Sequence, residues 1–68
     1  MDLNMLARIE ALVAEKDYVN ATIEAMKAAN ERRRRNGEAD AYGEQSFADC
    51  ANQLNDVATG LRTLAGVS

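Results

Sequence analysis

The sequence predicts an all-α protein: one antiparallel hairpin of a long and a shorter helix, which assembles as a homodimeric helical bundle. The 68-residue chain contains no proline and is rich in alanine, arginine and glutamate, which favour helix. Its apolar residues recur at alternating spacings of three and four. The pair Asn36-Gly37 interrupts this pattern and is typical of a helix end. Residues 1–68 are therefore expected to form one helical-hairpin domain.

The first helix is expected over about residues 3–35. Asp2 can cap its start, Arg32 to Arg35 suit the negative end of the helix dipole, and Gly37 suits the left-handed position that follows a helix. Lys16 and Asn30 interrupt its apolar face, where polar residues usually set register and oligomeric state. That face, the large stripe, consists of Met5, Ile9, Leu12, Val19, Ile23 and Met26.

A turn over about 36–39 and a second helix over about 40–65 are expected next, with Asp40 or Ser46 as the N-cap. Its apolar positions are Phe47, Cys50, Leu54, Val57, Leu61 and Leu64. Because so short a connection makes the helices antiparallel neighbours, we expect four pairs: Leu54 with Ile23, Val57 with Val19, Leu61 with Lys16, and Leu64 with Leu12. The second helix would then end too early to cover Leu3, Met5, Leu6 and Ile9.

A second stripe runs along the other side of the first helix. It consists of Ala7, Ala11, Ala14, Tyr18, Ala21, Ala25 and Ala28, which we call the alanine face. Small side chains let two helices approach closely, so the face can be a dimer contact or a partner site. Alanine also has a high helix propensity, so the face can equally be a solvent-exposed surface without a partner. Alternatively, the large stripe lies at the dimer axis together with the uncovered Leu3, Met5 and Leu6, and the alanine face is then free. The expected dimer interface comprises Leu3, Met5, Leu6, Ile9, Ala7, Ala11, Ala14, Tyr18 and Ala21.

Composition narrows the possible functions. The chain has no histidine and only one cysteine, Cys50, so an internal disulfide is excluded and a zinc site lacks its usual ligands. No phosphate-binding loop or nucleophile constellation is recognisable, so neither an enzyme nor a cofactor is expected. The lone thiol, the absence of a recognisable leader and the lack of a long apolar run suggest a cytoplasmic protein. Because two helices alone enclose only a small core, oligomerisation is the expected source of stability.

Charged residues suggest where a protein partner would bind. Glu10, Asp17, Glu24 and Glu31 recur every seven residues and form an acidic row, which is either a solvated face or a target for a basic surface. The arginine cluster, Arg32, Arg33, Arg34 and Arg35, either stabilises the helix end or grips a partner together with Tyr42. The candidate partner-binding residues are Arg32, Arg33, Arg34, Arg35, Tyr42, Glu10, Asp17, Glu24 and Glu31.

The plan of a long helix from Leu3 to Arg35, the Asn36-Gly37 stop and a shorter second helix resembles small accessory proteins of phages and plasmids that bind and inhibit host proteins, including anti-quorum-sensing antiactivators. This resemblance implies inhibition by occupancy of a regulator such as a transcription factor. The expected partners are a second copy of the chain and another protein, without membrane or small-molecule substrate. Nucleic-acid binding through the arginine cluster, or a structural role in a larger assembly, are the alternatives.

Overall fold

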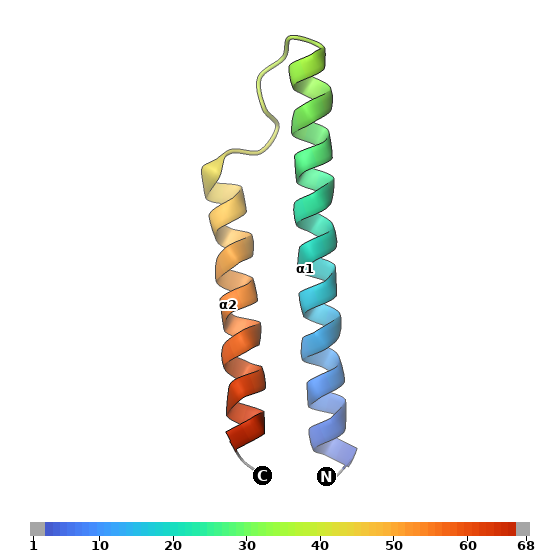
Figure 1. Cartoon of the computed structure of the whole chain (residues 1–68), viewed down its shortest axis with the longest axis vertical. Helices are drawn as coiled ribbons and strands as arrows, with labels where there is room; N and C mark the ends of the chain where they lie inside the picture. Colours follow the sequence, from blue (N-terminus) through green and yellow to red (C-terminus); the bar gives the residue numbers. More distant parts are fainter. Residues whose placement is uncertain (1–2, 67–68) are drawn as a thin grey trace.

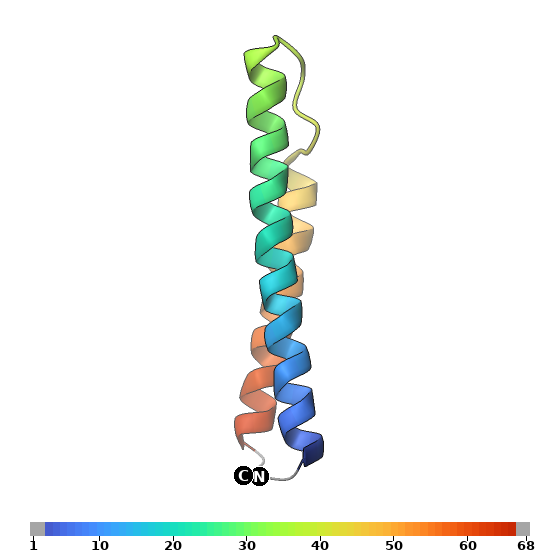
Figure 2. The same ribbon diagram turned by 90° about the vertical axis from the view of Figure 1, so that its right-hand side faces the viewer.

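The computed structural model describes residues 3–66, which form two antiparallel α-helices (Figure 1). Helix α1 spans Leu3–Arg35 and helix α2 spans Glu44–Gly66. The hairpin is a thin rod with extents of 53 × 17 × 10 Å, and Figure 2 shows that its helices cross at a shallow angle. The all-α hairpin and the bounds of the first helix are as the sequence predicts, whereas Asp2 lies outside the described residues.

The C-terminus of α1 is closed by backbone hydrogen bonds around Gly37. This glycine has φ +74°, a left-handed conformation that costs other residues free energy. The Gly37 N–H donates to the Arg34 carbonyl at 3.1 Å, and the Glu38 N–H donates to the Arg33 carbonyl at 2.8 Å. These two bonds define a Schellman motif. The prediction that Asn36-Gly37 ends the helix is confirmed.

Helix α2 begins later than the sequence suggests. It starts at Glu44 instead of about residue 40, and the connection runs over residues 36–43. Neither predicted N-cap is used: Asp40 binds Arg34, and Ser46 lies inside the first turn, where its N–H donates to the Gly43 carbonyl at 3.1 Å. The prediction was wrong because contacts to α1 hold this segment outside a helix.

Asn30 provides the main contact between α1 and the connection. Its Nδ2 donates to the Tyr42 carbonyl oxygen at 2.9 Å, and the Tyr42 N–H donates to its Oδ1 at 3.0 Å. The Asn30 side chain is 5% exposed, and it is the buried polar residue of the described chain. Because both backbone groups of Tyr42 are satisfied, Asn30 clasps the connection against α1 and fixes where α2 starts.

The core lies where the large stripe of α1 meets the apolar positions of α2. Val19, Met26, Cys50 and Val57 are its buried hydrophobic side chains within residues 3–66. The Cys50 Sγ lies 3.9 Å from the Met26 Sδ, which confirms that the thiol is a core residue. Ile23 and Leu54, expected to be neighbours, both pack against the cluster of Val19, Met26 and Cys50, as does Phe47. Lys16, by contrast, is exposed.

The end of the hairpin opposite the connection, which we call the free end, lacks the overhang that the sequence predicts. Helix α2 ends near the level at which α1 begins, so α1 extends beyond α2 at the connection (Figure 1). Met5 and Ile9 are half-buried, and only Leu3 (83%) and Leu6 (42%) of the four expected overhanging residues are exposed. The expected overhang was wrong because residues 36–43 run back alongside α1 before α2 starts.

Replacing Asn30 tests the clasp. Asn30→Ala leaves the N–H and C=O of Tyr42 without their partner, so we expect the free energy of unfolding to fall by about 1–3 kcal/mol. Urea unfolding followed by circular dichroism measures this loss. Asn20→Ala, at an exposed position of the same helix, is the matched control. Equal stability of the two variants would contradict the clasp.

Candidate protein-binding surface

The outer side of α1 carries the alanine face, and every residue of that face is exposed. Helical geometry divides it into two rows that recur every seven residues. One row contains Ala7, Ala14, Ala21 and Ala28, and the other contains Ala11, Tyr18 and Ala25. The Tyr18 ring is 74% exposed. Helix α2 therefore covers one side of α1 and leaves an apolar row open on the other.

The acidic row lies beside the Ala7 row, and all four of its carboxylates are exposed. Glu24 accepts a hydrogen bond from the Lys27 ammonium at 3.2 Å. Glu31 forms an ion pair with Arg35 at 3.1 Å. Glu10 and Asp17 have no ion pair among residues 3–66. The unpaired negative charge of this row is therefore concentrated in the N-terminal half of α1.

The arginine cluster is largely occupied by contacts within the hairpin tip. Arg34 binds Asp40 in a two-pronged arrangement, with Nε donating to Oδ1 at 2.8 Å and Nη2 donating to Oδ2 at 2.9 Å. Arg33 lies 4.0 Å from the Glu38 carboxylate, and Arg35 pairs with Glu31. Arg32 alone has no ion pair among the described residues. Internal carboxylates thus balance much of the positive charge that a phosphate or acidic partner would need.

The contact between Arg34 and Asp40 also changes their proton affinities. Hydrogen bonding to the Arg34 guanidinium lowers the pKa of Asp40 below its ordinary value, although slight desolvation opposes this. The same hydrogen bond, supported by the carboxylate charge, raises the pKa of Arg34. Both groups therefore stay charged at neutral pH and hold the connection to the end of α1.

Tyr42 lies beside this ion pair and is 40% exposed. It borders a hollow of about 280 Å³ at the hairpin tip, whose other lining residues are Asn30, Arg34, Asp40, Gly43, Glu44 and Phe47. The structure thus brings Tyr42 and Arg34 together, as the sequence suggested. It adds Asn30 and Asp40, whose contacts with the tip depend on the folded connection.

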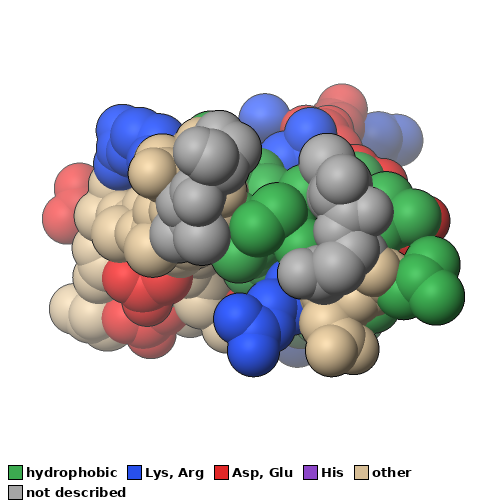
Figure 3. All heavy atoms as spheres, turned by 90° about the horizontal axis from the view of Figure 1, so that it is seen from below, with side chains coloured by type: hydrophobic (Ala, Val, Ile, Leu, Met, Phe, Trp, Pro, Cys, Tyr) green, Lys and Arg blue, Asp and Glu red, His purple; other side chains and the backbone are tan. Residues whose placement is uncertain are grey.

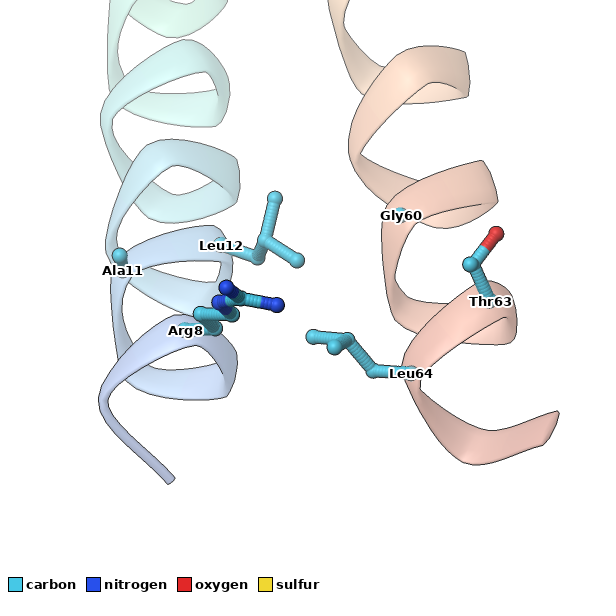
Figure 4. A pocket seen from close by; sticks show the side chains of 6 residues that line it. All are labelled: Arg8, Ala11, Leu12, Gly60, Thr63 and Leu64. Carbon is cyan, nitrogen blue, oxygen red and sulfur yellow. The ribbon is translucent and has the colours of Figure 1, made fainter. Parts of the chain in front are cut away.

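The structure also contains a groove that was not predicted from the sequence. It lies between the helices at the free end and has a volume of about 440 Å³. Leu12 and Leu64 point toward one another across it, and Arg8 extends from α1 toward α2 (Figure 4). Hydrophobic side chains gather between the helices at this end of the molecule (Figure 3). Gly60, inside the C-terminal half of α2, was the available signal, because glycine within a helix lowers stability and often marks a close contact that offsets the loss.

Two further features of the described chain bear on its possible sites. Neither α1 nor α2 is apolar over a stretch long enough to cross a lipid bilayer. Within residues 3–66, acidic and cysteine side chains form no cluster of three suited to a metal ion. The surface features of this part of the chain are thus an open apolar face, a row of carboxylates, a hairpin tip held by ion pairs, and an interhelical groove.

The Arg34–Asp40 contact predicts a pH dependence of stability. Since folding lowers the pKa of Asp40, its contribution is present above the ordinary carboxyl range and is lost as the pH falls below about 4. At pH 7 we expect Asp40→Asn to have a lower Tm than the wild type, and the difference should shrink at pH 3. Asp56→Asn, which removes an unpaired carboxylate on α2, is the control. A Tm difference for Asp40→Asn that is unchanged at pH 3 would contradict the assignment.

Comparison of this chain with protein-family models, with curated proteins and with solved structures gave no match. The function proposed for the chain therefore rests on its own residues and contacts.

Proposed function

We propose that this chain is a non-enzymatic, protein-binding helical hairpin that associates with itself and inhibits a regulatory protein, such as a transcription factor, by occupying its surface. The observation that carries this proposal is the open outer side of α1. Only Val19, Met26 and Asn30 are buried among the described residues of this helix, although its apolar residues occupy two sides.

The small core supplies the physical reason for association. Domains of this size gain little stability from a single core, and oligomerisation is a common remedy. Leu3, Leu6, Val13 and Tyr18 are all exposed on α1. Leu6 and Val13 lie on one side of the acidic row and Tyr18 on the other, so contacts with more than one helix would be needed to remove this apolar surface from water and add favourable free energy. Protein binding through α1 thus serves the stability of the chain as well as its function.

The acidic row supports a basic partner. Glu10 and Asp17 present carboxylates that no ion pair within residues 3–66 neutralises. Opposite charges across an interface steer association and select the partner. A nucleic-acid-binding surface is rich in lysine and arginine, so it offers the charge that this row would attract. Covering such a surface would prevent its owner from binding DNA or RNA, which is inhibition by occupancy.

The arginine cluster supports the alternative, nucleic-acid binding, less well. Three of its four guanidinium groups have a carboxylate partner at the hairpin tip. Contact with phosphates would have to replace these ion pairs. The acidic row lies on the same helix and would repel a nucleic acid.

Affinity capture with matched charge variants tests the proposed function. The wild-type chain is used to capture protein from a lysate of its source organism, and the stoichiometric partner is identified by mass spectrometry. Glu10→Lys/Asp17→Lys should weaken binding of the purified partner at least tenfold, or about 1.4 kcal/mol. Asp49→Lys/Asp56→Lys, which reverses two exposed charges on α2, should leave the affinity within about twofold of the wild type.

Binding of the partner should also weaken as salt concentration rises, because ions screen exposed charges. Unchanged binding by the α1 double variant would contradict the role of the acidic row. Failure to retain any protein other than the chain itself would contradict inhibition by occupancy.

A further inference from the structure

We propose that the groove at the free end of the hairpin binds the Tyr18 side chain of a second copy of this chain. The inference rests on the self-association proposed above and specifies the contact that produces it. Each copy has one groove and one exposed Tyr18, so a two-fold dimer would fill both grooves.

The shape of the groove suits an inserted side chain. Leu12 and Leu64 form its apolar walls, and Ala11, Arg8 and Thr63 lie around them. A Cβ atom at Gly60 would lie 3.2 Å from the Leu12 Cδ1, so the bare glycine leaves room for Leu12. The groove is open to solvent in a single hairpin, and its lining is mostly apolar. An apolar ring placed there would be removed from water.

Tyr18 has the position needed to reach the groove of another copy. It is 74% exposed and lies in the same row as Ala11, which borders the groove. Seven residues separate these positions, or about 10 Å along the helix. A two-fold axis level with residues 14 and 15, halfway between them and on the groove side of the alanine face, would place each Tyr18 beside the Ala11 of the other copy in an antiparallel pair.

The chemistry of the groove complements a tyrosine. The Arg8 guanidinium has no ion pair among the described residues, and a cation beside an aromatic face is attracted to it. Buried tyrosine hydroxyl groups usually find a hydrogen-bond partner. The Thr63 hydroxyl donates to the Thr59 carbonyl at 2.9 Å, and its oxygen can still accept a bond from the Tyr18 hydroxyl.

The acidic rows disfavour a dimer centred on the middle of the alanine face. An antiparallel dimer centred on the alanine face would bring the two acidic rows together, because each row borders that face. Asp17 would then lie near its own copy across the axis, and like charges at that separation repel. The groove lies on the other side of the Tyr18 row, so a dimer through the groove keeps the acidic rows apart and places one exposed carboxylate, Glu15, near its own copy. Those rows then remain available to the basic partner.

Site-specific photo-crosslinking tests the contact. Tyr18 is replaced by the photoreactive residue p-benzoylphenylalanine, and unlabelled and ¹⁵N-labelled chains are mixed so that crosslinks between copies are recognised by mass. We expect crosslinks between copies from position 18 to residues 8–12 and 60–64. The same residue at position 42, on the hairpin tip, is the control and should give no crosslink to these segments.

Sedimentation of Tyr18→Ala provides a second measurement, and because Tyr18 is exposed in the single hairpin, its ring contributes little to packing within one chain. The dimer dissociation constant should rise at least tenfold. Tyr42→Ala should leave it within about twofold of the wild type. A wild-type dimer that crosslinks only elsewhere, or that tolerates Tyr18→Ala, would overturn the groove contact while leaving self-association intact. A wild-type monomer at micromolar concentration would overturn both.

Discussion

A helix with one neighbour can bury one side, and this limit shapes the whole hairpin. Helix α1 uses the large stripe against α2, where Val19, Met26, Cys50 and Val57 form the core. The alanine face stays exposed, and of its residues Ala11 borders the groove between the helices. The second apolar side of α1 is thus left open. The proposed self-association and the proposed binding of a regulator both follow from this limit.

Asn30 determines how the two helices are aligned. It occupies a core-facing position in the large stripe, yet it binds both backbone groups of Tyr42 instead of packing an apolar side chain. That contact delays the start of α2 and brings its end near the start of α1. Gly60 consequently lies against Leu12, and both residues line the groove. A polar contact at one end of the rod therefore sets the geometry of the proposed site at the other.

Features with a local signal were predictable from the sequence. The bounds of α1, the glycine that ends it and the place of Cys50 in the core follow from periodicity and from the conformational freedom of Gly37. The exposed acidic and alanine rows follow from their seven-residue spacing. These properties depend on neighbours within one or two helical turns, and the sequence displays such neighbours directly.

Features that depend on contacts between distant residues were not predictable. The start of α2 was placed too early because Asp40 resembles an N-cap, whereas the folded chain gives its carboxylate to Arg34. The expected overhang at Leu3 to Ile9 followed from that error. The groove exists only once two helices are aligned, although Gly60 marked it. For the outer face of α1, the sequence identified the residues but left their use undecided.

The central claim is that α1 gains stability by packing on another copy through its second apolar side. Thermal unfolding of the wild-type chain, followed by circular dichroism over a hundredfold range of protein concentration, tests it most directly. If the folded chain is a dimer, mass action requires Tm to rise steadily with concentration. A Tm that stays constant over this range, together with the sedimentation of a monomer, would contradict the claim.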